Sequence, residues 1–215
     1  QSRWNCDGNF WIYTYEKRKT AAEFARLIAR MKDGHISAPM TTLVSTYGAQ
    51  PAEAVLRGMY YAGSLERRYG LKFNLAVAME NATLPFGLGS LWAGSGAKYS
   101  WRGICGCATR TPGAGDRPDI YWWQGLDKSR ILMKWNKFYV YPGSSIGNYF
   151  ECRFPDYALQ TVLTNSDFQT NWPYNVIGIF GKGGDDAETL TDSFVNFAQA
   201  NSNSAHDIIV SNESD

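Results

Sequence analysis

Apolar residues along the chain recur with two spacings, which predict helices and strands in turn. Helical spacing predicts helices over 19–31, 50–69, 84–95, 156–165 and 188–200. Apolar, aromatic or β-branched runs predict extended segments over 9–16, 35–45, 72–79, 97–101, 120–124, 130–135, 137–142, 174–180 and 207–211. Because strands alternate with helices, the pattern indicates a mainly parallel sheet with helices outside it.

Glycine, proline and turn residues lie at the ends of the predicted elements, which agrees with this α/β pattern. Gly34 and Gly70 follow two predicted helices, and Pro51 stands in the first turn of the second. The turn 125–128 separates two strands and predicts a β-hairpin. A closed barrel and an open doubly wound sheet both fit.

We find no internal repeat and no linker, so we expect a single domain over 1–215. The last predicted strand runs into the end of the sequence without a following helix. We therefore expect a partial barrel, cut from a protein with additional domains.

Composition narrows the choice of partner. The formal net charge is +1, which argues against a nucleic-acid surface. No stretch of about 18 apolar residues occurs, so no membrane span is expected. The chain has 8 Trp and 13 Tyr, which fit either a Trp-rich core or a carbohydrate site with aromatic faces. Localisation stays open, with secretion or export to the periplasm as alternatives.

Glu80 is the first candidate for chemistry. It ends the apolar run 71–79, and a charge there needs a partner or a function because burying it is costly. In α/β folds the carboxyl end of a strand is where catalytic groups lie. A nucleophile, a general acid or base and a metal ligand are all open roles. The structural alternative is a helix cap or an ion pair with Lys or Arg.

Two further groups are open to function. Asp185 and Asp186 follow the predicted strand 174–180 across glycines, so they are candidates for binding a metal or sugar hydroxyls, and Asp186 is equally suited to cap the next helix. Trp122 and Trp123 lie on a predicted strand, where they either pack the sheet or face a sugar.

Metal and nucleophile motifs are sparse. His35 and His206 are the only histidines. His35 opens a predicted strand and His206 immediately precedes one, so both lie at the strand end opposite to the expected site. The 4 cysteines, Cys6, Cys105, Cys107 and Cys152, fit free or disulfide-bonded structural roles better than a zinc knuckle. Serine-nucleophile and phosphate-loop motifs do not occur.

Several segments, in order, resemble one known family. They are Arg3–Asp7 with Phe10–Trp11, the helix Ala52–Tyr61 with its Glu-x-x-x-Arg-Gly, the step Leu91–Tyr99, the hairpin Tyr121–Asp127 and the turn Gly181–Asp186. Together with the strand before Glu80, they resemble the N-terminal catalytic domain of glycoside hydrolase family 38, the zinc-dependent retaining α-mannosidases.

The resemblance implies a seven-stranded (β/α)-barrel, related to the glycoside hydrolase and deacetylase barrels. It implies a zinc ion held by a His-x-Asp pair, the nucleophilic Asp and a later His, and a second carboxylic acid that protonates the leaving oxygen. On this basis Glu80 takes the nucleophile and metal positions, and Asp186 and Asp156 are candidates for the acid. Asn81 joins Asp185, Trp122 and Trp123 as a candidate for substrate binding.

The chain departs from the family pattern in two ways. Glu80 stands where the family has Asp, and its extra methylene moves the carboxylate by roughly 1.5 Å, which matters for attack geometry. No His-x-Asp pair occurs in the chain, so Glu80 is at most one of the zinc ligands.

Two functions follow as alternatives. The first is α-mannosidase-like retaining hydrolysis of glycosidic bonds, and the second is a non-catalytic relative that binds glycans through its aromatic residues. A carbohydrate deacetylase is a third alternative, but it needs Asp and two neighbouring His.

Overall fold

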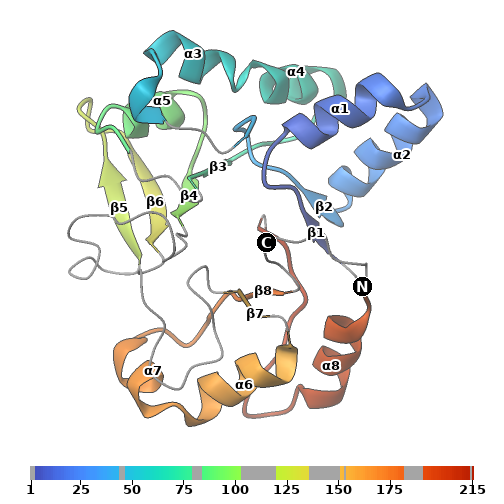
Figure 1. Cartoon of the computed structure of the whole chain (residues 1–215), viewed down its shortest axis with the longest axis vertical. Helices are drawn as coiled ribbons and strands as arrows, with labels where there is room; N and C mark the ends of the chain where they lie inside the picture. The colour runs from blue at the N-terminus through green and yellow to red at the C-terminus, as the bar shows by residue number, and fades with distance from the viewer. Residues whose placement is uncertain are drawn as a thin grey trace.

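The computed structural model describes residues 3–43, 47–78, 84–102, 120–135, 151–152, 154–181, 191–213 and 215. In these ranges the chain is a mixed α/β protein with helices around short sheets (Figure 1). The elements up to residue 135 form the upper group in that view, and the elements from 151 to 201 form the lower group. No helix in the described ranges is long and apolar enough to cross a membrane.

The chain begins with a parallel strand pair. Strand β1 (Trp4–Asn5) lies beside β2 (Ile36–Ser37), and Trp4 faces Ile36 in the register. Two helices connect these strands. The expected strand over 35–45 is therefore much shorter than predicted.

The first connecting helix corrects the sequence prediction. The segment 9–16, for which the aromatic pattern predicted an extended structure, supplies the N-cap Asn9 and most of α1 (Phe10–Arg18). The backbone N–H of Asn9 donates to the carbonyl of Thr41 at 3.0 Å, after which the chain turns into the helix. Ile12 is the residue that α1 buries. Tertiary contacts override the preference of aromatic residues for strands, which depends strongly on context.

The second connecting helix confirms its prediction. Helix α2 (Ala21–Lys32) starts after Thr20, whose hydroxyl accepts from the N–H of Glu23, and the Glu23 carboxylate accepts from the N–H of Thr20 in return. This reciprocal capping box satisfies two N–H groups that would otherwise lack partners. Gly34 follows the helix with a positive φ of 78°, a conformation that suits glycine.

The long helix predicted over 50–69 is two helices. They are α3 (Ala52–Arg57) and α4 (Tyr60–Tyr69), preceded by the 3₁₀ turn η1 (Tyr47–Ala49). The hydroxyl of Thr42 donates to the carbonyl of Gly58 at the break. Because that carbonyl lies in the turn between the helices, the contact ties the break to the segment after β2.

A four-stranded sheet forms the centre of the upper group. Strands β3 (Leu75–Val77), β4 (Tyr99–Arg102) and β6 (Arg130–Trp135) are parallel neighbours, and β5 (Ile120–Gln124) pairs antiparallel with β6 at the edge. The predicted hairpin around 125–128 is confirmed. The predicted strands over 72–79 and 97–101 are present with shifted or shorter bounds.

The two upper sheets are connected, but they do not show a barrel. The N–H of Met40, after β2, donates to the carbonyl of Leu75 in β3 at 2.8 Å. This bond links the segment after β2 to β3, and so connects the parallel pair β1 and β2 to the sheet that contains the parallel pair β3 and β4. The described strands nevertheless form separate sheets of two, four and two strands, so what is shown is a mixed α/β fold.

The core lies between the sheet and the helices. Helix α5 (Leu88–Gly94) covers one face of the four-stranded sheet, and the Trp92 ring meets the Trp123 ring edge to face at 5.9 Å. Trp92, Leu65 and Ile131 are fully buried. Burial of these apolar side chains holds the helices on the sheet.

The lower group contains α6 (Pro155–Thr164), α7 (Ser166–Asn171), α8 (Ser193–Asn201) and the parallel pair β7 (Glu151–Cys152) and β8 (Phe180–Gly181). Helix α6 agrees with its prediction. Helix α7 was not predicted, and it starts at the cap of Asn165, whose side chain accepts from the N–H of Phe168.

The last two predicted strands of the chain are wrong in part or in whole. Only Phe180 of the segment 174–180 lies in a strand, and Val176 is 78% exposed. The segment 207–211 has no strand assignment, and Ile209 is 73% exposed. An apolar run becomes a buried strand only when a neighbouring strand and a covering layer are available.

Candidate active site

The carboxyl ends of the parallel strands form the candidate site. Val77 ends β3, Ala78 follows it, and both are buried. The N–H of Val77 donates to the hydroxyl of Thr41 at 3.3 Å, and the Tyr47 hydroxyl donates to the Val77 carbonyl at 3.5 Å. Burial raises the pKa of Tyr47 to about 12, against the opposing hydrogen bond with Thr41, so this hydroxyl stays protonated near neutral pH.

Asn9 adds a buried amide between β1 and the segment after β2. Its Nδ2 donates to the carbonyl of Met40 at 2.7 Å. Its Oδ1 is shielded from solvent and has no hydrogen-bond partner among the described residues. A buried acceptor of this kind is ready to take a donor from a ligand or a water.

A carboxyl group lies between β1 and β4. The Glu213 Oε1 accepts from the indole N–H of Trp101 in β4 at 3.1 Å, and the Glu213 backbone N–H donates to the Oδ1 of Asn5 in β1 at 2.9 Å. The Glu213 Oε2 is shielded from solvent and has no partner among the described residues. In Figure 1 the C-terminus lies accordingly near the middle of the molecule.

The surroundings of Glu213 favour its neutral form. Burial raises its pKa to about 7, the Trp101 hydrogen bond opposes the shift, and the negative charge of Asp7 adds to it. Glu213 is therefore partly protonated at neutral pH. A pKa close to the working pH is the property that suits a general acid or base. Glu213 was not among the site residues predicted from the sequence. The available signal was an acid just after the apolar run 208–210, the same pattern that selected Glu80.

Cys6 lies beside this carboxyl as a buried, free thiol. Burial raises its pKa to about 11, with smaller effects from a hydrogen bond to Trp4 and from the charges of Asp7 and Glu213. The thiol is neutral near pH 7, which makes it a poor nucleophile and a poor metal ligand. Of the two structural roles predicted for the cysteines, free and disulfide-bonded, Cys6 has the free one.

Most of the predicted site residues lie outside the described ranges. These are Glu80, Asn81, Asp185 and Asp186, and the predictions for them stay predictions. Asp156 is described: it is exposed in the first turn of α6, where a carboxylate stabilises a helix N-terminus. Helix α6 belongs to the lower group of elements (Figure 1).

The two predicted tryptophans point to opposite faces of β5. Trp123 is half-buried and packs against Trp92 and Gly89 in the core, which favours the packing role. Trp122 is 61% exposed on the other face. It stands opposite Leu132 of β6, and Leu132 stands opposite Tyr99 of β4, so one row crosses three strands.

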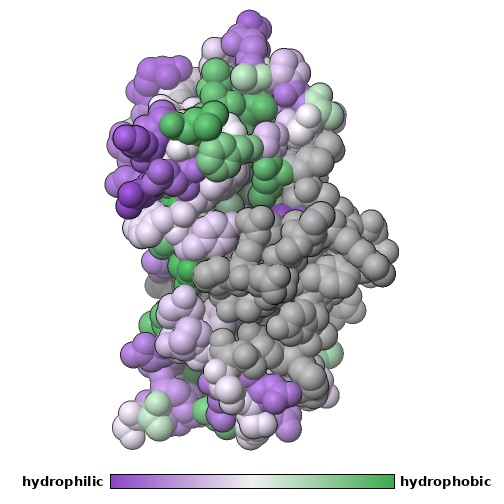
Figure 2. Space-filling model, turned by 90° about the vertical axis from the view of Figure 1, so that its left-hand side faces the viewer, coloured by the Kyte–Doolittle hydropathy of each residue, from purple (hydrophilic) through white to green (hydrophobic). Residues whose placement is uncertain are grey.

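The side of the molecule with the hairpin carries further exposed apolar residues. Leu126 in the hairpin turn and Phe86 before α5 are 75% and 58% exposed. Figure 2 shows this side, where hydrophobic residues gather in the upper half among hydrophilic ones.

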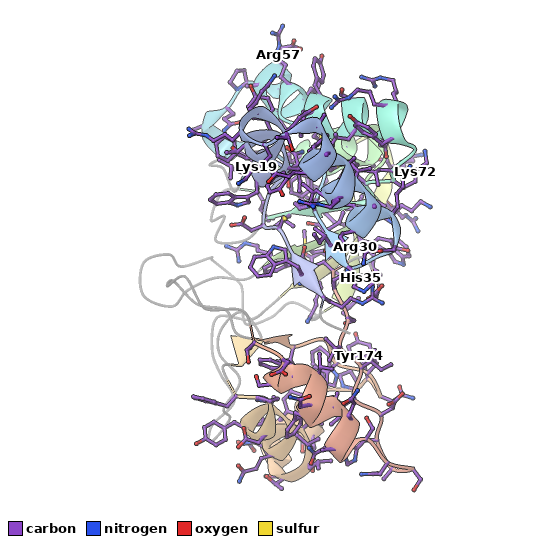
Figure 3. The ribbon with its side chains drawn as sticks, turned by 90° about the vertical axis from the view of Figure 1, so that its right-hand side faces the viewer. Lys19, Arg30, His35, Arg57, Lys72 and Tyr174 are labelled. Atoms are coloured by element: carbon purple, nitrogen blue, oxygen red, sulfur yellow. The ribbon has the colours of Figure 1, made fainter. Side chains whose placement is uncertain are left out.

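The described residues do not fit a zinc site. They contain no group of three His, Cys, Asp or Glu side chains that could hold a metal ion. His35 Nδ1 lies 2.7 Å from Asp33 Oδ1 just before β2, and Figure 3 shows it near Arg30, which pairs with the same carboxylate. His206 is engaged by Asn203 in the segment after α8. The zinc prediction stays a prediction, and we derive no chemistry through a metal.

Comparisons with known proteins identify the fold and not the family. No family model and no curated protein matches the sequence. Among solved structures, an α-mannosidase from Enterococcus faecalis V583 matches with a TM-score of 0.57 and 14% identity over 84% of this chain. A protein of glycosyl hydrolase family 38 from Enterococcus faecalis matches with a TM-score of 0.53 and 11% identity over 86%.

The chain therefore has a fold like that of glycoside hydrolase family 38 proteins. It spans only about a fifth of the length of these two, 20% of the first and 19% of the second. The likeness in fold does not by itself assign a catalytic residue, because function depends on the site.

Proposed function

We propose that this chain is part of a glycosidase-like protein that hydrolyses glycosidic bonds, with α-mannosides as the substrate class. The observation that carries the proposal is the fold shared over 84% of the chain with an α-mannosidase. The parallel pairing of β1 with β2 and of β3 with β4 supports it, since active sites of such folds lie at the carboxyl ends of the strands.

In this proposal Glu80 is the nucleophile. Its carboxylate attacks the anomeric carbon and forms a glycosyl ester, which water then hydrolyses with retention of configuration. The chain reaches Glu80 two residues after Ala78, at the buried end of β3. Asn81 and Asp185 are proposed to bind sugar hydroxyls.

The test is hydrolysis of aryl α-mannosides by the protein and by Glu80→Gln, with and without added zinc. We expect Gln at this position to abolish turnover, since an amide cannot form the ester. The exposed Glu53 of α3 provides the matched control, and Glu53→Gln should leave the rate unchanged. If Glu80→Gln hydrolyses aryl α-mannosides as fast as the unmodified protein does, Glu80 has no part in the mechanism.

A second function, glycan binding without hydrolysis, is supported by the row of Tyr99, Leu132 and Trp122. The two aromatic residues are 46% and 61% exposed, and the strand spacing sets them about 10 Å apart. Aromatic faces stack on the apolar faces of sugar rings.

Calorimetry with a panel of mannose oligosaccharides tests this alternative. Binding that is lost in Trp122→Ala, in a protein that shows no hydrolysis, would favour it. Absence of heat with every glycan would reject it.

A further inference from the structure

The proposed function leaves open which residue provides its second carboxyl group. A retaining glycosidase needs a second carboxyl group that protonates the leaving oxygen. Asp186 lies outside the described ranges, and Asp156 is exposed in the first turn of α6. Glu213, by contrast, is hydrogen-bonded to a residue of β1 and to a residue of β4.

The geometry around Glu213 is that of a built site. Its backbone is held by Asn5, the last residue of β1, and its Oε1 by Trp101, near the end of β4. Trp101 clusters with Leu75 and Val77 on the face of the sheet opposite to Ala76, which belongs to the main core. Glu213 therefore lies over the face of the sheet that α5 leaves uncovered.

One oxygen of this carboxyl group is held and the other is free to react. The hydrogen bond from Trp101 fixes Oε1, while Oε2 is shielded from solvent without a protein partner among the described residues. Leaving a buried oxygen unsatisfied costs about 1–3 kcal/mol, a cost that a proton or a ligand removes.

We propose that Glu213 is the proton-transferring residue of the glycosidase site, an inference that rests on the proposed function. As the bond between the anomeric carbon and the glycosidic oxygen breaks, the proton on Oε2 moves to that oxygen, which keeps the bonding electrons. The Glu80 carboxylate forms the ester at the same carbon. Water then attacks this carbon and gives its proton to Glu213, and the ester bond breaks, which restores both residues.

Neighbouring groups set the protonation of Glu213. Within the described part of the chain, Asp7 and Cys6, both just after β1, are the titratable groups with which it interacts. Trp101 of β4 donates a hydrogen bond to the Glu213 carboxyl group and is a positioning residue in this proposal. On its own segment Asp215 lies 3.9 Å from Arg3.

The first experiment compares two mannosides, one with an activated aryl leaving group and one with a poor alkyl leaving group. Glu213→Gln keeps the shape of the side chain and an oxygen for Trp101, but it carries no proton to donate. We expect its kcat to fall about 10²- to 10⁴-fold for the alkyl mannoside. The loss should be much smaller for the aryl mannoside, and azide should restore turnover with a glycosyl azide as product.

The second experiment follows the basic limb of the pH profile of kcat/KM. Trp101→Phe removes a hydrogen bond that favours the carboxylate, so the limb should move to higher pH. Asp7→Asn removes a negative charge that disfavours the carboxylate, so the limb should move to lower pH. A residue that only holds the fold would produce no such opposite shifts.

The outcomes separate the inference from the function on which it rests. If the protein hydrolyses mannosides and Glu80→Gln does not, while Glu213→Gln retains the wild-type rate on the alkyl mannoside, the inference about Glu213 is wrong and the function stands. If the unmodified protein hydrolyses neither mannoside, the function itself fails and the inference fails with it.

Discussion

At the residue scale, the protonation of Glu213 is the property with measurable consequences. Its pKa is about 7 in the folded protein, against an ordinary value of 4.5. The folded state therefore binds a proton that the unfolded state releases between these values. The stabilising contribution is complete below pH 4.5 and is lost as the pH rises through 7.

This linkage predicts the stability of Glu213→Gln. Between pH 4 and 8 the free energy of unfolding of the wild type should fall, relative to the variant, by up to about 3 kcal/mol. Urea titrations of both proteins at several pH values measure the difference, in which the other titrating groups cancel. A constant difference across this range would contradict the raised pKa.

At the element scale, the helix ends show how single residues set boundaries. Gly70 follows α4 with a φ of 70°, and among the described residues no atom beyond its two chain neighbours lies within 4 Å of where a Cβ would stand. The need for glycine there comes from the backbone conformation alone. At Gly87, before α5, the space is equally open, but φ is −68°.

These two glycines form a matched pair of variants. Gly70→Ala should destabilise the protein by about 1–2 kcal/mol, because an L-residue is strained at positive φ. Gly87→Ala should be neutral or slightly stabilising, because alanine restricts the unfolded chain. Thermal or urea unfolding measures both, and equal effects would show that the conformation at residue 70 is not what requires glycine.

Element types were predicted well where one local signal was strong. The helix that opens at 19–20 and the hairpin around the turn 125–128 were predicted from the sequence, and both are confirmed. The segment 9–16 was wrong because its aromatic residues suit a strand by preference, while its bonds to the segment after β2 lead into a helix.

At the scale of the whole molecule, the hairpin is held to the core by one side of β5. Trp123 packs on Trp92, whereas Trp122 faces away and is 61% exposed. Neighbours on a strand point to opposite faces, so identical substitutions test opposite environments.

We expect Trp123→Ala to destabilise the protein by about 3 kcal/mol, as truncation of a packed aromatic residue does. Trp122→Ala should change stability by no more than about 0.5 kcal/mol, as surface substitutions do. Its effect should appear instead in glycan binding, if the row with Leu132 and Tyr99 binds sugars. Chemical denaturation and calorimetry on the same two variants separate the roles.

The sequence by itself determined the α/β class, the helices with clear caps, the hairpin and the carboxylate that follows the β3 run, because these depend on neighbours within a few residues. The tertiary structure decided which apolar runs became buried strands, where the helix over 50–69 breaks and that Glu213 lies between β1 and β4. Those outcomes depend on contacts between residues far apart in the chain, such as Asn5 with Glu213 and Thr42 with Gly58. Local spacing carries no information about such contacts.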